Sequence, residues 1–422
     1  MGIRNEGGTF MKETFQKFAD LFHRVDPSAT FAFEFWDGSS SGFGSHPAVV
    51  LRLKTPKAAE QILKKGFYGL GEAYVSGRAE IDGDLRELLR LGFASRIEES
   101  GPHWLQLLQN FRHQCMTRIS PHRPDKDVPR HYDLGDELFA LFLDPTMTYS
   151  CAYFKSGDVS LEEAQLSKYD HIARKLLLQP GERLLDVGCG WGGMLIFAAR
   201  NYQTDGLGNT LSRNQYEYAR RKILELGLNG RVEVVLQDYR QCTGKFDKFV
   251  SIGMLEHVGK DFLGDYMKKV AGLLKKGGLG LLHTIGKETE SITDPWITRY
   301  IFPGGYLPSL AEIVGNMGRA GLSILDIENL RLHYSRTLDH WAANFDRNLD
   351  RARRLFGEKF VRMWRFYLLS CSAGFRYGAT RVYQVLFSNG LNNDLPTTRD
   401  HVYLGESPGW AAFEEPLASC AS

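Results

Sequence analysis

Residues 184–193 read LLDVGCGWGG, and this stretch decides the fold. An apolar run ends in Asp186 and passes into glycines at positions 188, 190, 192 and 193, after which a helix-like segment begins. Glycine lets the backbone turn sharply and lets a ligand approach the peptide groups. Open α/β sheets bind ligands where the carboxyl end of a strand meets the start of a helix. The stretch therefore predicts a buried strand followed by a ligand-binding turn. Its spacing is not that of a P-loop, so a cradle of that type is disfavoured.

The rest of this half of the chain alternates between strand-like and helix-like patterns. Short apolar runs predict strands at 183–188, 205–211, 231–237, 246–254, 279–286 and 322–329. Amphipathic segments predict helices at 193–202, 212–227, 266–277 and 308–321. Strands joined by helices imply βαβ units. We therefore expect an α/β fold with a mostly parallel sheet that helices cover on both faces.

Composition excludes several classes of function. The 422 residues are 43% hydrophobic and 24% charged, which is typical of a globular chain of two or three domains. Lys and Arg number 52 against 50 Asp and Glu, so no global basic field favours nucleic acid. No apolar run reaches the ~18 residues that span a bilayer, and the N-terminus lacks an apolar signal-peptide core. Six cysteines form no CxxC pair, so we expect a cytoplasmic protein without a metal site or a disulfide framework.

The sequence divides into four segments. Residues 1–95 predict a small α+β domain, residues 96–130 a proline-containing linker, residues 131–390 the catalytic domain, and residues 391–422 a C-terminal tail. Within the first segment we expect helices at 11–25 and 57–66, strands at 30–38 and 48–54, and a turn-rich stretch at 69–89. This domain has no catalytic spacing, and its role is either lipid contact or dimerisation.

The pattern D-x-G-x-G-x-G at 186–192 resembles motif I of the class I S-adenosylmethionine-dependent methyltransferases; the alternative is a dinucleotide site. Such enzymes often end the second strand in an acidic residue, whereas this chain reads GNTLS at 208–212. Thr210 and Gln215 are the available substitutes. Asp238 follows the third strand, where a residue that contacts adenine usually lies. The alternative for Thr210 and Asp238 is that they only cap turns.

Segments outside this motif carry a more specific resemblance. They are HYDLGDELFALFLDPTMTYSCAYF (131–154), TLSRNQYEYAR (210–220), SIGMLEHVG (251–259), HTIG (283–286), WITRYIFPGGYLPS (296–309), HYSRTLDHWAANF (333–345) and CSAGFRYG (371–378). Together they resemble the cyclopropane-fatty-acyl-phospholipid synthases and the related mycolic acid cyclopropane synthases. Residues 69–85 also resemble the extra N-terminal domain of the phospholipid-acting branch, which favours intact phospholipid as the substrate.

The resemblance implies a class I methyltransferase fold, Rossmann-like and preceded by the small α+β domain. It implies transfer of the S-adenosylmethionine methyl group to the cis double bond of an unsaturated phospholipid acyl chain. A carbocation deprotonated by bound bicarbonate then closes a cyclopropane ring. The matching cofactor positions are Tyr149, Ser150, Asp186, Gly188, Cys189, Gly190, Thr210, Gln215, Asp238 and Tyr239. The matching anion-site positions are Cys151, Glu256, His283, Ile285 and Tyr334, and Cys371 matches a further active-site cysteine.

This chemistry makes physical sense of the residue types. An alkene is a poor nucleophile, so the enzyme has to position it against the sulfonium and tolerate positive charge. Glu256 and His283 follow neighbouring strands and can reach one crevice, where Tyr334 can donate its hydroxyl. Aromatic faces stabilise a cation, although most rings can equally belong to the core. The rings put forward are Tyr149, Tyr153, Phe154, Trp296, Tyr300, Tyr306, Trp341, Phe345 and Phe375. We do not expect Cys371 to act as a covalent nucleophile, because the reaction has no acyl intermediate.

The substrate lies in a bilayer, so we expect peripheral association with the inner face of the membrane. Basic and apolar residues mix at 347–369, as in interfacial helices; the alternative is a solvated face of a packed helix. We also expect a homodimer. Three other functions remain open: methyl transfer that gives a methylene- or methyl-branched chain, non-catalytic lipid binding, and methylation of a small molecule.

Overall fold

The computed structural model describes residues 6–95 and 135–404, which form two compact units. The first unit combines the N-terminal residues with 294–301 and 338–379, and the second holds the other described residues. The predicted linker at 96–130 lies outside the described residues, as does the tail beyond residue 404. Residues 294–301 and 338–379, which the sequence placed in the catalytic domain at 131–390, thus group with the N-terminal residues. The domain bounds drawn from the sequence remain a prediction.

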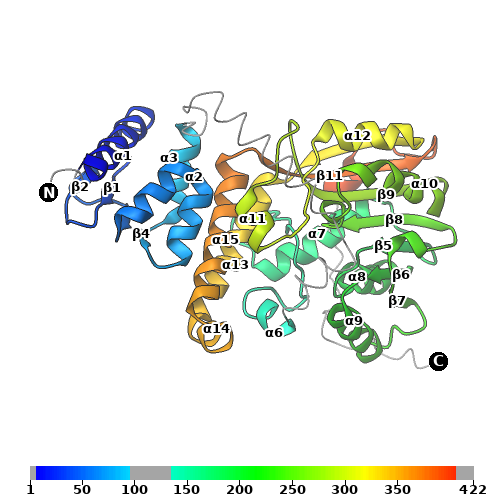
Figure 1. The fold of residues 1–422 in the computed structure, drawn as a ribbon. Helices are drawn as coiled ribbons and strands as arrows, with labels where there is room; N and C mark the ends of the chain where they lie inside the picture. Colours follow the sequence, from blue (N-terminus) through cyan, green and yellow to red (C-terminus); the bar gives the residue numbers. More distant parts are fainter. Residues whose placement is uncertain (1–5, 96–134, 405–422) are drawn as a thin grey trace. The chain divides into compact units, whose positions relative to one another are not determined.

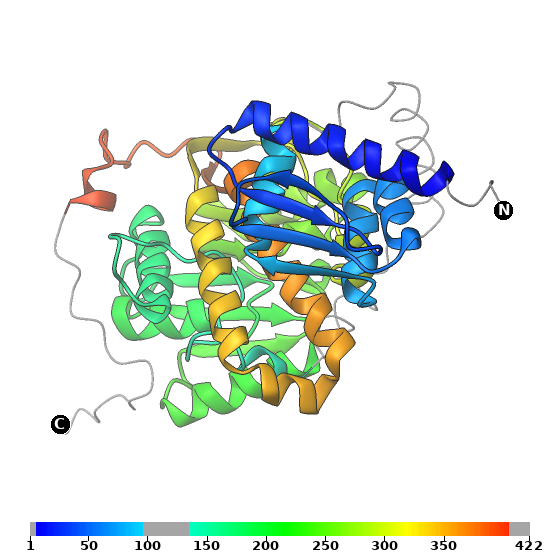
Figure 2. The same cartoon turned by 90° about the vertical axis from the view of Figure 1, so that its left-hand side faces the viewer.

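The first unit contains a four-stranded sheet in the order β2-β1-β3-β4. The strands are β1 (Phe31–Glu34), β2 (Ser40–Phe43), β3 (Val49–Leu53) and β4 (Ala79–Gly83). Helix α1 (Glu6–Val25) runs along this sheet (Figure 2). Alternating burial in β1 turns Phe31 and Phe33 toward the helix, where they meet Phe22 and Phe15 at ring-centroid distances of 5.5 and 5.1 Å. The helix and both strands expected near these positions are confirmed.

The turn-rich stretch expected at 69–89 was wrong. Helix α2 (Pro56–Val75) runs into it past a kink at Gly66, and helix α3 (Leu85–Ala94) occupies its end. Gly69 and Gly71 serve close packing within α2, whereas Gly77, with φ 71°, does lie in a turn. A Cβ on Gly69 would lie 2.1 Å from the carbonyl oxygen of Gln61, and a Cβ on Gly71 would lie 2.6 Å from Nε1 of Trp296.

Helices from the C-terminal half complete the first unit. They are α11 (Pro295–Tyr300), the end of α13 (Arg331–Arg347), α14 (Leu349–Phe356) and α15 (Glu358–Tyr377). On α15, Arg362 donates to the carbonyl oxygens of Tyr74 (2.7 Å) and Ala79 (3.0 Å), while Trp364 and Phe366 are buried. The expectation that all of 347–369 forms a docking surface therefore needs correction, because part of it is core. No helix among the described residues is both long and apolar enough to cross a membrane.

The second unit contains a seven-stranded sheet in the order β10-β11-β9-β8-β5-β6-β7 (Figure 1). The strands are β5 (Arg183–Val187), β6 (Asp205–Thr210), β7 (Val232–Leu236), β8 (Phe246–Ile252), β9 (Leu274–Lys287), β10 (Leu322–Asn329) and β11 (Thr380–Asn389). Strands β5 to β9 pair in parallel, and β11 runs antiparallel between β9 and β10. The expected α/β fold with a mostly parallel sheet is confirmed. Strand β11 was missed by the sequence analysis.

Four helices of this unit match the expected segments: α8 (Gly193–Tyr202), α9 (Arg213–Glu225), α10 (Leu263–Leu273) and α12 (Leu310–Arg319). The sequence analysis did not expect helix α7 (Leu161–Lys175) or the short α6 (Asp136–Phe139) and α16 (Asp400–Tyr403). Helix α10 ends at Leu273 and not at Gly277 as predicted, because Leu274 already pairs with Phe246 of β8. Gly277, with φ 72°, lies in the irregular part of β9.

Gly280 on β9 offers a test of how closely β9 packs against the ring of Phe387 on β11. A Cβ on Gly280 would lie 2.3 Å from the ring of Phe387, so Gly280→Ala overpacks the core and should lower the free energy of unfolding by ~1–3 kcal/mol. Gly272→Ala, on α10 with no atom within 4 Å of the added Cβ, should instead raise it by ~0.5–1 kcal/mol. Urea unfolding of both variants measures the difference, and equal effects would contradict the packing.

Candidate active site

The predicted strand–turn–helix is present at residues 183–202. Strand β5 is buried from Leu184 onward, and α8 begins just after the glycines. Gly188, Gly190 and Gly192 have φ values of 80°, 55° and 85°, a region that side chains rarely adopt. The amides of Gly188 and Cys189 donate to the carbonyl oxygen of Asn209 on β6, at 3.1 and 3.0 Å. The turn is thereby fixed at the carboxyl edge of two neighbouring strands.

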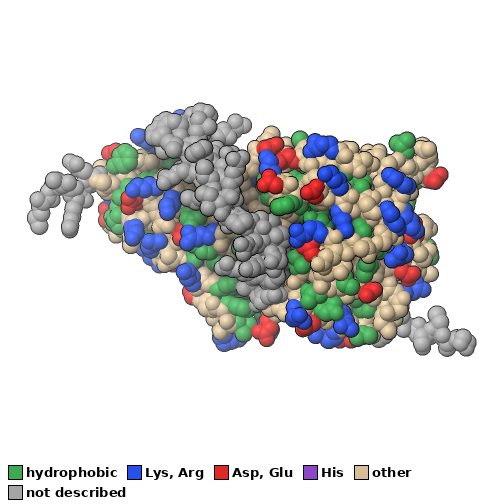
Figure 3. Space-filling model, turned by 45° about the vertical axis from the view of Figure 1, so that its right-hand side comes forward, with side chains coloured by type: hydrophobic (Ala, Val, Ile, Leu, Met, Phe, Trp, Pro, Cys, Tyr) green, Lys and Arg blue, Asp and Glu red, His purple; other side chains and the backbone are tan. Residues whose placement is uncertain are grey.

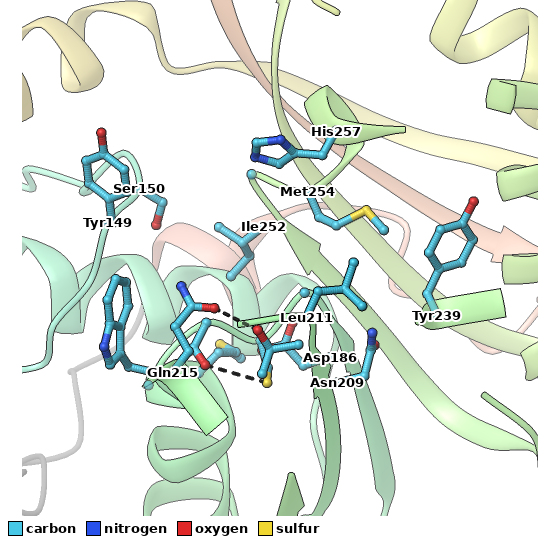
Figure 4. Close-up of a pocket in the computed structure, with 18 of the residues that line it drawn as sticks. Tyr149, Ser150, Asp186, Asn209, Leu211, Gln215, Tyr239, Ile252, Met254 and His257 are labelled. Carbon is cyan, nitrogen blue, oxygen red and sulfur yellow. Dashed lines mark hydrogen bonds between the residues drawn. The ribbon is translucent and has the colours of Figure 1, made fainter. Parts of the chain in front are cut away.

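A cavity opens over this turn (Figure 4). All ten cofactor positions expected from the sequence line it: Tyr149, Ser150, Asp186, Gly188, Cys189, Gly190, Thr210, Gln215, Asp238 and Tyr239. In the close-up, Tyr149 and Ser150 lie on one side and Tyr239 on the other. The structure thus gathers residues from five separate segments of the chain around one space at the strand ends.

Two buried charges set the electrostatics of the cavity. Burial raises the pKa of Asp186 to about 7, although the nearby Lys168 opposes this shift. Burial also lowers the pKa of Lys168 to about 7, and its ammonium donates to Oγ of Ser150 at 3.0 Å. Oδ1 of Asp186 is buried and has no hydrogen-bond partner among the described residues. A carboxylate oxygen of this kind fits a ligand that brings donors or positive charge, as S-adenosylmethionine does.

Thr210 and Asp238 cap turns, as one interpretation has it, and their contact with a cofactor stays a prediction. Thr210 donates to Oε1 of Gln215 at 2.7 Å and accepts from the amide of Ser212, so it orders the start of α9. Asp238 accepts from the amide of Arg240 at 2.8 Å and pairs with its guanidinium, which lowers the pKa of Asp238. Both residues therefore cap turns, and both also line the cavity.

Three of the anion-site positions lie close together where β9 continues past the end of β8: Glu256, His283 and Ile285. The last pair of these strands is Ile252 with His283, and the amide of Ile285 then has no strand partner on that side. Oε1 of Glu256 accepts from this amide at 2.6 Å. Glu256 is 7% exposed, and burial raises its pKa to about 7. Its Oε2 has no partner among the described residues, so near neutral pH this carboxyl group can present a proton.

Cys151 and Tyr334 reach the same neighbourhood through Leu330. The thiol of Cys151 contacts the carbonyl oxygen of Leu330 at 3.8 Å, and the amide of Tyr334 donates to the same oxygen at 3.1 Å. The amide of Leu330 donates to Val382, which pairs with Ile285 across β11 and β9. Leu330 and Val382 therefore connect Cys151 and Tyr334 to Ile285, which in turn contacts Glu256 and lies two residues from His283. Burial raises the pKa of the Cys151 thiol, so it stays protonated and is no nucleophile at neutral pH.

Cys371 belongs to the first unit, on α15, whereas the other five candidates belong to the second. Burial raises the pKa of its thiol to about 12, with the nearby Asp294 adding to the effect. This protonated thiol agrees with our expectation that Cys371 is not a covalent nucleophile. Of the rings put forward from the sequence, Tyr149 lines the cavity, while Trp296, Trp341, Phe345 and Phe375 are buried in the first unit.

Lys168, Met254 and His257 are among the cavity residues that sequence reasoning missed. Lys168 lies on the buried face of α7, and a lysine among apolar positions of an amphipathic helix is the signal that could have found it. Met254 and His257 also line the cavity, on the segment after β8 that carries Glu256 (Figure 4). Both residues follow a strand of the parallel sheet, and ligands bind at the carboxyl edge of such a sheet. This position is the signal that could have found them.

Comparison with known proteins agrees with this geometry. Residues 120–385 match the family model described as mycolic acid cyclopropane synthetase. The chain belongs to this family. A second model, for a domain of unknown function, matches residues 18–98.

Two curated relatives match most of this chain. The "probable fatty acid methyltransferase" of Pseudomonas putida is 38% identical over 87% of this chain and 95% of its own length. The cyclopropane-fatty-acyl-phospholipid synthase of Escherichia coli K12 is 38% identical over 84% of this chain and 92% of its own. A solved structure of mycolic acid cyclopropane synthase CmaA1 with SAH and CTAB is 36% identical, with a TM-score of 0.60 over 64% of this chain and 99% of that one. This family member is thus an S-adenosylmethionine-dependent methyltransferase that modifies lipids.

Proposed function

We propose that this enzyme cyclopropanates unsaturated acyl chains of phospholipids. The observation that carries the proposal is that the cavity over the glycine turn is lined by Met254 and His257, the neighbours of Glu256 on the segment after β8. Glu256 itself is outside the lining and binds the amide of Ile285 at the end of β9, beside His283. Support for intact phospholipid comes from the length of the match to the Escherichia coli synthase, which covers 84% of this chain and so extends beyond residues 120–385.

The cavity residues are suited to hold S-adenosylmethionine. When bound, this group supplies an electrophilic methyl, which adds to one alkene carbon and leaves positive charge on the other. Asp186 brings a buried, unpaired carboxylate oxygen, and Gly190 leaves space beside its peptide group. Lys168 donates to Oγ of Ser150 at 3.0 Å, and burial lowers its pKa to about 7, which reduces the positive charge that opposes a cationic ligand there. The surrounding apolar residues exclude water, which strengthens each electrostatic contact.

The second group of residues is suited to hold a small anion, for which we propose bicarbonate. Such an ion supplies a proton acceptor for the hydrogen that leaves as the ring closes. Oε2 of Glu256 and Nε2 of His283 are buried and have no partners among the described residues, so both can donate to an anion. The hydroxyl of Tyr334 is a third candidate donor, on the segment that joins this neighbourhood through Leu330. A held oxygen anion avoids placing a strongly nucleophilic side chain against the sulfonium.

A second candidate product is a methylene- or methyl-branched chain. The observation that favours it is the name of the Pseudomonas putida relative, a probable fatty acid methyltransferase, which matches at the same 38% identity. Ring closure removes a proton from the transferred methyl group while that carbon bonds to the cationic carbon. A methylene branch needs a hydride shift to the cationic carbon before the methyl group loses its proton, and a saturated methyl branch needs a separate reductant as well. The deciding experiment incubates the enzyme with S-adenosylmethionine and chain-defined unsaturated phospholipid vesicles, follows S-adenosylhomocysteine, and identifies the lipid by NMR. Cyclopropane signals support the proposal, branched products support the second candidate, and turnover without lipid overturns both.

We further propose a cytoplasmic homodimer that docks on the inner face of the membrane through exposed basic residues of α14 and α15. Figure 3 shows Lys and Arg interspersed with Asp and Glu on the face in view. Because that face is not uniformly basic, docking on an anionic membrane requires a local cluster of basic residues. Such a cluster is offered by Arg351, Arg354 and Lys359, which are exposed. Light scattering of the purified protein tests the dimer.

Replacing these three basic residues by alanine should weaken binding to anionic vesicles roughly 100-fold at low salt, since each basic group near such a surface contributes about 1 kcal/mol. Co-sedimentation across a salt series measures the effect. The matched control replaces Arg213, Arg220 and Arg221, three exposed basic residues of α9, and should bind as the wild type does. Equal losses in both variants, or binding that salt does not change, would contradict the docking site.

A further inference from the structure

Gln384 on β11 lies directly opposite His283 on β9. The two residues are partners in the antiparallel register, and Nε2 of Gln384 lies 3.2 Å from Nδ1 of His283. Gln384 is fully buried and His283 is 2% exposed. Strand β11 was missed by the sequence analysis, and the mechanism above does not use this glutamine. A buried polar pair of this kind fixes the geometry of both side chains.

The direction of this hydrogen bond follows from the chemistry of the amide. The NH₂ group of glutamine has two donors and no acceptor, so Nδ1 of His283 must accept. Burial lowers the pKa of His283 to about 3, and the positive charges of Lys168 and Lys175 add to the effect. The imidazole is therefore neutral at physiological pH and carries one proton. With Nδ1 accepting, that proton is on Nε2, the nitrogen that has no partner among the described residues.

We propose that Gln384 is a positioning residue that holds His283 in the Nε2–H form, so that the imidazole donates a hydrogen bond into the anion site. This inference rests on the proposed function for the identity of the anion, but the tautomer itself does not depend on it. It also assigns a role by exclusion: an imidazole that donates from Nε2 does not accept the proton lost by the substrate. The held anion is then the acceptor, and His283 orients it.

The opposite arrangement has a different chemical consequence. If the amide were turned so that Oε1 of Gln384 accepted from Nδ1–H, then Nε2 would present a lone pair. His283 would then be the base of the reaction, and the anion would have one donor fewer. The two arrangements therefore predict different ¹⁵N spectra for the same ring.

The test is ¹⁵N NMR of the histidine side chains in the ligand-free protein near pH 7.5, with the His283 signals assigned by their loss in His283→Asn. We expect His283 as a single neutral Nε2–H tautomer. Gln384→Met, which keeps the size but removes the donor, should give a mixture of tautomers and lower kcat about tenfold, with an unchanged Kd for S-adenosylmethionine. Gln384→Glu should favour the Nδ1–H form and raise the pH at which the ring titrates.

Leu386→Ala is the matched control, because it disturbs a buried side chain on the same face of β11, two residues away. It should lower stability and leave the His283 tautomer unchanged. An Nδ1–H or charged His283 in the wild type overturns the inference, as does a Gln384→Met spectrum identical to the wild type. The spectra need no substrate, so the tautomer result does not depend on which lipid product the enzyme makes. Equally, an unexpected tautomer would not change the product assignment.

Discussion

Gly190→Ala should weaken binding of S-adenosylmethionine by about 10- to 100-fold, the equivalent of ~1–3 kcal/mol of steric conflict. The reason is the position of the missing side chain. Gly190 lines the cavity, and the nearest protein atom to an added Cβ is Nε2 of Gln215, at 4.0 Å. The methyl group thus enters the space that the cofactor needs without clashing with the protein. Isothermal titration calorimetry with S-adenosylmethionine measures the loss.

A backbone effect has to be separated from this steric one. Gly190 has φ 55°, so alanine there also strains the chain by roughly 1–2 kcal/mol. Gly227→Ala is the matched control: its φ is 68°, nothing lies within 4 Å of the added Cβ, and it follows α9 away from the cavity. We expect both variants to lose similar stability and only Gly190→Ala to lose affinity. Wild-type affinity in Gly190→Ala would show that the cofactor does not lie against this turn.

Glu256→Gln should lower kcat by ~10²–10⁴-fold while leaving the Kd for S-adenosylmethionine within about twofold. Gln can still accept from the amide of Ile285, which is 2.6 Å from Oε1 in the wild type, so the local fold is kept. What is lost is a carboxyl group whose protonation is set by burial. Single-turnover kinetics with unsaturated vesicles, together with calorimetry, separate chemistry from binding. A large loss of cofactor affinity, or an unchanged kcat, would contradict the assignment of Glu256 to the anion site.

The same substitution has a signature in stability. The pKa of Glu256 is about 7 in the folded protein, against 4.5 for a glutamate side chain in water, as in the unfolded chain. Between these values the unfolded chain has released its proton while the folded protein keeps it. The contribution of Glu256 to wild-type stability therefore falls as pH rises from 4.5 to 7, by about 3 kcal/mol. Glu256→Gln has no such loss, so its stability relative to the wild type should increase between about pH 5 and pH 8, as chemical denaturation at both pH values can measure.

Local sequence determined the glycine turn and its surroundings. The three left-handed positions 188, 190 and 192 are glycines because other residues are strained there, and the apolar run of β5 is buried because helices cover the sheet. Such rules act within a few residues, so the strand–turn–helix and the parallel sheet could be predicted. The resemblance of scattered segments to a known family supplied the candidate residues that no local rule selects.

Only the tertiary structure decided which residues meet. Lys168 lies far from the glycine turn in sequence, and its position beside Ser150 depends on how α7 packs. Gln384 faces His283 because β11 pairs antiparallel with β9 in one particular register, and a shift by one residue would turn the amide to the other face. Registers and helix packing are set by the sum of many distant contacts, which no short stretch of sequence contains. The sequence therefore determined the chemistry available to this protein, and the tertiary structure determined how that chemistry is arranged.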